Sequence, residues 1–172
     1  SEMLDRVRDG SLSEDIANGL WEQMGAEHDA FWGLDGDPAE GAVERSFAQF
    51  YATTRDFARF GQLLLDTGAW KGQQLIDKGF VTRMITPQHE LKPGLDTDYY
   101  GHQIWLGKTD DGLGFSLMEG LRGQIVLSVP GLDMVVVRTG YRKSEMKKRH
   151  LPVAAFEVLD IARGLLQRPV WQ

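Results

Sequence analysis

Cysteine is absent from this chain, and proline occurs only 6 times in 172 residues. The absence of cysteine excludes disulfides and thiolate metal sites. No apolar run approaches the roughly 20 residues that a membrane-spanning helix requires, so no membrane span is expected. Positive charge is also scarce, because 19 Lys and Arg stand against 25 Asp and Glu and leave a net charge of −6. Since phosphate binding needs a basic surface, nucleic acid is not an expected partner.

Metal and nucleotide motifs are missing as well. The histidines lie far apart in the sequence and form no His-Glu-x-x-His pair. No glycine-rich phosphate loop follows a predicted strand. The sequence therefore predicts no metal and no cofactor. The histidines are His28, His89, His102 and His150.

The composition is that of an ordinary globular protein, with 42% hydrophobic and 26% charged residues. Helical patterns fill the region 1–90, strand patterns occupy 99–139, and a final helix is predicted over 151–166. Helices followed by strands and a closing helix indicate an α+β fold in which helices flank an antiparallel sheet. Residues 1–172 are interpreted as part of one domain.

The helical region carries clear start and stop signals. Ser11 and Glu14 form a capping-box pattern ahead of a helix with an apolar face. A second cap at Thr53 precedes a helix that contains Gly61, and a glycine inside a helix predicts close packing against another element. Further expectations are a helix over 2–8, a loop over 26–50, a turn over 70–75 and a helix that Asp77 caps.

The strand region is the part around which the chain is organised. Strands are predicted over 115–119, 122–129 and 132–139, with a Pro130-Gly131 turn between the last two, and another strand over 99–106. Between the first two strands, the Gly120-Leu121 step could bring backbone N–H groups close to a ligand, because glycine has no side chain. The alternative is a structural hairpin with a glycine bulge.

Three segments of the chain resemble one enzyme family. The segment from Trp21 to Trp32 is similar to the one that follows the active-site tyrosine region in 6-aminohexanoate-dimer (nylon-oligomer) hydrolases. These enzymes belong to the serine β-lactamase and penicillin-binding protein superfamily. The segment 54–72 resembles the next helix and turn of the family, and 120–138 resembles its late sheet strands. The three segments follow the family order and cover nearly the whole chain.

The resemblance also implies what this chain does not contain. The family's Ser-x-x-Lys nucleophile and base, and its Tyr-x-Asn-like element, lie upstream of the matched region. None of the four tyrosines here is followed by asparagine two residues later. The chain therefore resembles the C-terminal half of a serine hydrolase. Alone it is expected to be inactive, and the N-terminal half of the parent domain is an expected partner.

Catalytic site residues follow from the same resemblance. The tetrapeptide Met118-Glu119-Gly120-Leu121 occupies the place of the family's Lys-Thr-Gly-Ser box. This implies that the Leu121 backbone N–H is an oxyanion-hole donor, and that Gly120 lets the strand approach the acyl group. Because Met118 stands where the family has lysine, the cationic grip on a β-lactam carboxylate is absent. The departure favours an esterase or amidase that acts on a small-molecule substrate.

Three substrate-binding residues are also implied. They are Trp32, in the long loop, and Glu119 and Arg122, on either side of the Gly120-Leu121 step. Arg122 could supply the missing positive charge, although alternation along a strand could equally point it away from the cleft. Trp32 could instead be a core residue.

Two shorter patterns match catalytic motifs of the superfamily without the expected surroundings. Ser144-Glu145-Met146-Lys147 has Ser-x-x-Lys spacing, but its basic neighbours indicate a wet surface, whereas such a nucleophile needs a desolvated lysine. Arg138-Thr139-Gly140 is similar to Lys-Thr-Gly and is interpreted as a strand end. Neither is predicted to be catalytic.

Two other interpretations stay open. One is a non-catalytic binding or scaffolding module of the same fold, and the other is an unrelated α+β domain. The family resemblance also implies that N-terminal strands pair beside the strand 132–139. Without them this strand would be an exposed apolar edge, so self-association through it is expected.

Overall fold

The chain divides into two compact units, Ser1–Arg59 and Phe60–Gln172, and each is described by itself. The computed structural model describes residues 10–87, 99–142 and 145–167. The interpretation of the whole chain as one domain stays a prediction. The helix expected over 2–8 lies outside the described residues.

The first unit is built from short elements. Helix α2 (Leu12–Ile16) continues into a π-helical turn, and strands β1 (Phe31–Trp32) and β2 (Phe50–Tyr51) form an antiparallel pair within the expected long loop and at its end. The predicted capping box is confirmed, because the Glu14 N–H donates to Ser11 Oγ and the Ser11 N–H donates to Glu14 Oε2. Helix α3 (Thr54–Leu65) begins in this unit, and the Asp56 N–H donates to the capping hydroxyl of Thr53, as predicted.

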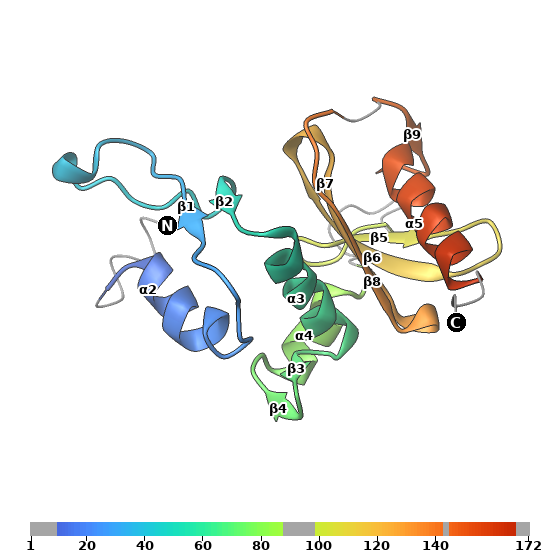
Figure 1. Cartoon of the computed structure of the whole chain (residues 1–172), viewed down its shortest axis with the longest axis horizontal. Helices are drawn as coiled ribbons and strands as arrows, with labels where there is room; N and C mark the ends of the chain where they lie inside the picture. The colour runs from blue at the N-terminus through green and yellow to red at the C-terminus, as the bar shows by residue number, and fades with distance from the viewer. Residues whose placement is uncertain (1–9, 88–98, 143–144, 168–172) are drawn as a thin grey trace, which may run out of the picture. The chain divides into compact units, whose positions relative to one another are not determined.

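The second unit is organised around a four-stranded antiparallel sheet (Figure 1). Its strands are β5 (Trp105–Lys108), β6 (Gly114–Gly120), β7 (Gln124–Val129) and β8 (Met134–Arg138), and they lie side by side in chain order. Each strand therefore pairs with the next one through a short connection. The predicted α+β class with an antiparallel sheet is confirmed.

Three predicted strand boundaries are wrong. The strand expected over 99–106 begins only at Trp105, and Tyr100 makes no more than an isolated bridge to Trp105. The strand expected from residue 122 begins at Gln124, because residues 121–123 form a 3₁₀ turn. The strand expected over 132–139 covers Met134–Arg138, since the Pro130–Leu132 turn and a left-handed Asp133 (φ 47°) precede it.

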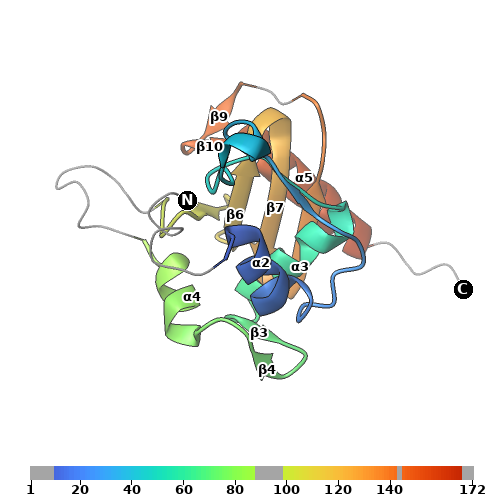
Figure 2. The same cartoon turned by 90° about the vertical axis from the view of Figure 1, so that its left-hand side faces the viewer.

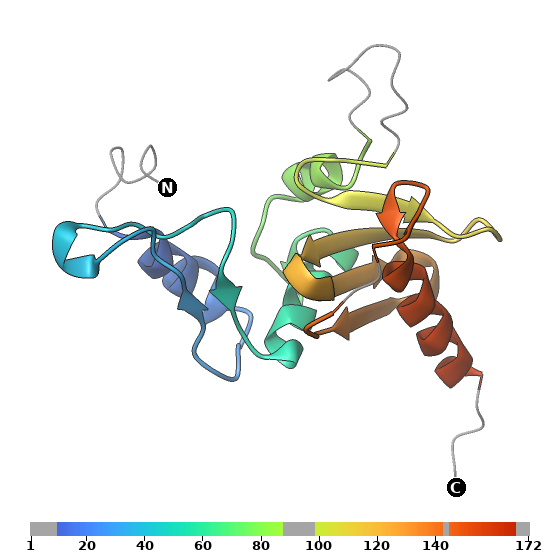
Figure 3. The same ribbon diagram turned by 90° about the horizontal axis from the view of Figure 1, so that it is seen from above.

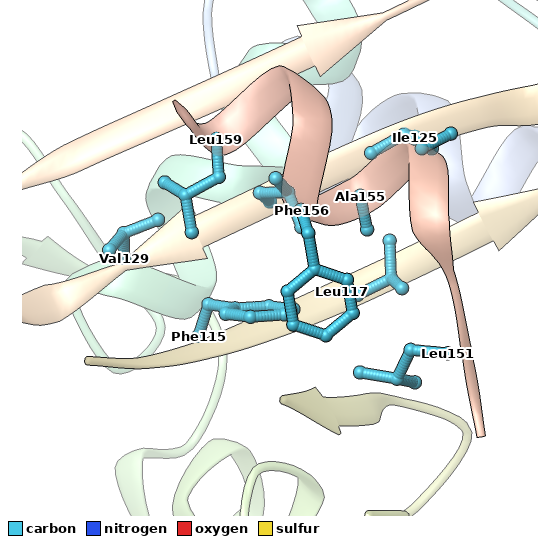
Figure 4. Packing of buried hydrophobic residues seen from close by; sticks show 10 residues of the cluster. Phe115, Leu117, Ile125, Val129, Leu151, Ala155, Phe156 and Leu159 are labelled. Carbon is cyan, nitrogen blue, oxygen red and sulfur yellow. The ribbon is translucent and has the colours of Figure 1, made fainter. Parts of the chain in front are cut away.

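One face of the sheet is covered by helix α5 (Val153–Leu166). The rings of Phe115 and Phe156 meet edge to face with their centroids 5.5 Å apart. Leu117, Leu127 and Leu159 are completely buried in the same cluster (Figure 4). The final helix was expected to start at 151, but residues 151–152 form strand β10 (Leu151–Pro152), which pairs with β9 (Lys147–Lys148).

The opposite face of the sheet is covered by the end of α3 and by helix α4 (Lys78–Met84), which are connected through the hairpin β3 (Ala69–Trp70) and β4 (Gln73–Gln74) (Figures 2 and 3). Asp77 caps α4, as predicted, by accepting a hydrogen bond from the Phe80 N–H at 2.7 Å. The buried Ser128 hydroxyl donates to the Gly61 carbonyl at 2.6 Å. Gly61 therefore lies directly on the sheet, which confirms the close packing expected at this glycine.

A cluster of ion pairs links the β5–β6 turn to α5 and to the β9–β10 hairpin. Arg163 on α5 binds Asp111 at 2.6 Å, and Lys148 binds Asp110 at the same distance. The hydrogen bond from Arg163, followed by one from the Thr109 hydroxyl, lowers the pKa of Asp111 to about 2. The turn is therefore tied to the helix by a carboxylate that stays ionised well into acid.

Gly61→Ala is expected to destabilise the second unit. A Cβ at this position would lie 2.5 Å from Val135 Cγ1 and 2.9 Å from Val126 Cγ1, so the β-branched side chains of two strands would have to move. Overpacking of this kind costs about 1–3 kcal/mol. That cost exceeds or cancels the gain of about 1 kcal/mol in helix propensity. The measurement is urea denaturation, followed by a signal from the sheet.

Gly164→Ala is the matched control, because nothing lies within 4 Å of a Cβ built at this helical glycine. It should leave the free energy of unfolding unchanged or raise it slightly. Equal effects of the two substitutions would contradict the close packing at Gly61.

Arg163→Gln is expected to return the pKa of Asp111 from about 2 toward its ordinary value of 3.8. A depressed carboxyl pKa contributes stability above the unfolded-state pKa, and this contribution is lost as pH falls through the folded-state pKa. The native protein should therefore lose this contribution between about pH 4 and pH 2, and the variant should lack the part that Arg163 supplies. NMR titration of the Asp111 carboxyl is the measurement, with Lys147→Gln as a charge-matched control that leaves the titration unchanged.

Candidate functional site

Four of the predicted site residues lie together where β6 ends. Glu119 pairs with Ile125 and Gly120 pairs with Gln124, which is the last pair of the β6–β7 ladder. At Leu121 the backbone leaves the sheet and forms the 3₁₀ turn 121–123. Arg122 adopts a left-handed conformation inside this turn, with φ at 60°.

The turn makes the Leu121 amide available. Leu121 is the first residue of the 3₁₀ turn, a position whose backbone N–H has no partner inside the turn. Its side chain is 84% exposed, so the packing of the core does not cover this corner. Gly120 is extended (φ −109°, ψ 169°), and a Cβ there would meet the Gln124 side chain at 2.9 Å. The glycine is needed for this close approach.

The neighbouring side chains separate to the two faces of the sheet. Directly paired residues of antiparallel strands share a face. Glu119 therefore lies on the α5 side with buried Ile125, while Met118 lies with Val126 on the side that α3 and α4 cover. Met118, which the sequence resemblance aligns with the family lysine, is an apolar packing residue in the cluster around Leu64.

Arg122 does not lie where the sequence reasoning placed it. It was expected at the start of a strand, where alternation would decide its direction, but it lies in the turn and is exposed. Its orientation is therefore set by the turn and not by the pleat.

Two residues of this corner were missed from the sequence. The Gln124 side chain bonds to both backbone groups of Gly140, and the Arg138 guanidinium donates to the Gly123 and Arg142 carbonyls. Gln124 lies in no motif, and Arg138 was interpreted from the sequence only as part of a strand end. Only the pairing of β7 with β8 brings them together.

Trp32, the fifth predicted site residue, belongs to the first unit. Its indole N–H donates to the Arg45 and Ala48 carbonyls, and its ring packs against Phe50 at a centroid distance of 5.1 Å. It also lines a hollow of about 470 Å³ together with Trp21 and His28. The indole therefore has a structural role and borders a cavity as well.

The most buried charge of the first unit is Asp56. Its carboxylate accepts hydrogen bonds from the Glu27 N–H, the Thr53 hydroxyl and the Arg59 guanidinium at 2.7–2.9 Å, and it is completely inaccessible to solvent. His28 Nδ1 lies 3.8 Å from its Oδ2. The Arg59 guanidinium also binds Glu27 at 2.8 Å, so one cation serves two carboxylates.

The electrostatics keep both of these carboxylates ionised. Burial by itself would raise the pKa of Asp56, but the hydrogen bonds from Glu27 and Thr53 and the charge of Arg59 more than offset it, and the pKa is lowered. The hydrogen bond from Arg59 likewise lowers the pKa of Glu27. The network therefore fastens the start of the long loop to the first turn of α3.

Other kinds of site receive no support from the geometry. Across residues 10–87, 99–142 and 145–167, no three His, Asp or Glu side chains gather as metal ligands would. Within the same ranges, no helix is long and apolar enough to cross a bilayer. Of the Ser-x-x-Lys look-alike, Ser144 lies outside the described residues and Lys147 is in β9. Arg138 ends β8, as expected of a strand end.

No family model matches this sequence, and no curated protein matches it. Solved structures do. A protein from Bacillus anthracis, described as a candidate 6-aminohexanoate-dimer hydrolase, is 27% identical with a TM-score of 0.71 over 94% of this chain. A candidate β-lactamase from Bacteroides dorei has a TM-score of 0.59 at 14% identity over 86% of this chain. The chain spans 40% of the first neighbour and 50% of the second.

Asp56→Asn is expected to destabilise the first unit by about 3 kcal/mol. The substitution removes the charge while keeping the size, and it leaves the Arg59 guanidinium without its buried counter-ion. Thermal unfolding monitored by the fluorescence of Trp21 and Trp32 is the measurement. Asp66→Asn, at an exposed turn residue directly after the end of α3, should change the stability by no more than about 0.5 kcal/mol. Equal losses in the two variants would contradict the role given to Asp56.

Proposed function

Because the chain has a β-lactamase-like hydrolase fold, we propose that it is the C-terminal part of a serine hydrolase that cleaves a small ester or amide. The nucleophile is a serine of an upstream Ser-x-x-Lys segment, which attacks the carbonyl carbon and expels the alcohol or amine. Water then hydrolyses the acyl-enzyme. In this proposal the present chain contributes the wall of the site that stabilises the oxyanion.

The observation that carries the proposal is the exposed amide at the end of β6. Leu121 begins a turn that leaves the sheet, and the extended Gly120 before it lies against the Gln124 side chain. A fixed N–H aimed at the developing oxyanion contributes about 3–4 kcal/mol to the lowering of the barrier. A backbone donor supplies this whatever its own side chain is, so the leucine is no obstacle.

The side chains around this amide favour an ester or amide over a β-lactam. Met118 packs in an apolar cluster and offers no positive charge to a carboxylate. Arg122 is the proposed replacement, because it is exposed one residue beyond the amide. Glu119 is a further proposed substrate contact in this unit. For the first unit, the proposed binding role of Trp32 is supported by the hollow that it lines there. The neighbour described as a candidate 6-aminohexanoate-dimer hydrolase supports an amide as the first substrate to try.

Leu121→Pro is the sharpest test of the oxyanion role. Proline lacks the N–H, is tolerated at the first position of a helical turn, and requires an extended preceding residue, which Gly120 already is. In the protein that includes the upstream region, acylation by a fluorophosphonate probe should fall on the order of 10²–10³-fold. Leu121→Ala keeps the N–H and should acylate at nearly the native rate.

Labelling also separates the hydrolase from a second candidate, a binding or scaffolding module that uses the same surface without chemistry. Labelling of an upstream serine supports the hydrolase. The absence of labelling in the native full-length protein would favour the binding module. Labelling of the present 172-residue chain alone would contradict the proposed position of the nucleophile.

We also propose that the chain studied alone associates through β8. This strand lies at one end of the sheet order, and among the described strands it pairs only with β7. Its residues 134–138 are half-buried and mostly β-branched. An unpaired strand edge is a template for another chain.

Sedimentation equilibrium of this chain should therefore reveal association that increases with concentration. Val137→Lys places a charge on the edge strand and should reduce it. Ile161 on α5 is an apolar residue that is 65% exposed. Ile161→Lys should therefore have little effect on the association. A monomer at high concentration, with the amides of 134–138 protected from exchange, would contradict the proposal.

A further inference from the structure

We infer that the side chains of Gln124 and Arg138 are positioning residues that hold the 121–123 turn, and with it the Leu121 amide, in one conformation. The inference rests on the proposed function only for its catalytic consequence. The structural part stands on contacts within the second unit.

The backbone of this turn does not hold its own shape. Arg122 and Gly123 are both left-handed, with φ at 60° and 85°. The left-handed region disfavours a residue with a Cβ such as Arg122. Residues 121–123 also lie beyond the last pair of the β6–β7 ladder. Contacts from elsewhere are therefore needed to keep the conformation.

The Gln124 side chain supplies the first of these contacts by acting as a substitute peptide group. Its Nε2 donates to the Gly140 carbonyl at 2.5 Å, and its Oε1 accepts from the Gly140 N–H at 3.1 Å. Ile125 pairs with Arg138, and the same antiparallel register continued outward would pair Gly123 with Gly140. The side-chain amide of Gln124 therefore takes the place that the Gly123 backbone would take in a longer sheet, which frees that backbone to turn away.

Arg138 supplies the second contact. Its guanidinium donates to the carbonyl of Gly123, inside the turn, and to the Arg142 carbonyl at 2.8 Å. Gly140 lies against it, because a Cβ at Gly140 would be 3.2 Å from Nη1. The carbonyl that has left the ladder is thus held by a cation that is itself packed between the turn and residues 140–142.

The two side chains act on both ends of the turn. Gln124 also packs directly against Gly120, since a Cβ at Gly120 would lie 2.9 Å from Gln124 Cβ. The amide of Leu121 therefore lies between a glycine that rests on Gln124 and a carbonyl that Arg138 holds. An oxyanion donor is effective when its direction is preset before the reaction, so this arrangement is the one that the chemistry requires.

Backbone order parameters from ¹⁵N relaxation test the structural part in the 172-residue chain. Rigid backbone gives values near 0.85 and flexible backbone gives values below about 0.6. Gln124→Leu keeps the stem but removes both hydrogen bonds, and we expect residues 121–123 to fall from the rigid to the flexible range. Gln124→Glu keeps the acceptor for the Gly140 N–H and should lose less order than Gln124→Leu.

Two further variants complete the test: one removes the second contact of the turn, and the other is a control remote from it. Arg138→Lys loses the planar fork that reaches two carbonyls and should loosen the same three residues. Gln62→Leu removes the hydrogen bond that Gln62 on α3 donates to Asp66, and it should leave residues 121–123 rigid. If the order parameters of 121–123 are unchanged in both Gln124→Leu and Arg138→Lys, the inference is overturned, whatever the protein catalyses.

Kinetics of the protein that includes the upstream region test the catalytic consequence. Misplacement of a catalytic group costs on the order of 10²-fold in rate. Gln124→Leu should lower kcat by that factor with KM changed less than about threefold, because the turn donates to the oxyanion and not to the substrate ground state. If the native protein acylates and kcat is unaffected while the turn loosens, the positioning role is overturned. If the native protein does not acylate, the proposed function fails while the relaxation result still decides the structural part.

Discussion

The burial of β6 and β7 on both faces is the constraint on which the second unit depends. Leu117 and Leu127 point toward α5, while Val126 and Ser128 point toward α3 and α4, so neither face can be left without a helix. Gly61 determines how closely α3 approaches the sheet. Its carbonyl accepts a hydrogen bond from the Ser128 hydroxyl, and the absence of a side chain leaves room for Val126 and Val135. The distance between α3 and the sheet therefore depends on which strand residues face the helix.

The same constraint explains why the candidate site lies where it does. Each residue of the buried strands faces one of the two apolar layers, and Met118 packs in the layer on the α3 and α4 side. In this part of the sheet, backbone polar groups are free of the apolar packing only where β6 ends and the chain leaves the sheet. There the backbone amide of Leu121 is the proposed oxyanion donor, and the Gln124 side chain bonds Gly140 where the sheet no longer continues.

The first unit is stabilised differently, because its helices and strands are short and bury little apolar surface. Its long loop is fastened by a buried carboxylate, and Asp56 joins a loop amide, a cap hydroxyl and an arginine. Edge-to-face contacts of Phe50 with Trp21, Trp32 and Phe57 complete the packing. Such a unit depends on a few specific contacts, since short elements bury too little apolar area to supply much stability on their own.

The sequence by itself determined the features whose cause lies within a few residues. The cap of α2 by Ser11, the cap of α4 by Asp77 and the Pro130-Gly131 turn each follow from a side chain and its near neighbours. Strand ends could not be predicted this way, because a strand continues only while a partner strand accepts its hydrogen bonds. The face on which Glu119 lies, the position of Arg122 in a turn and the contact of Gln124 with Gly140 were decided by the tertiary structure. Each depends on the pairing of strands that only the folded sheet brings into register.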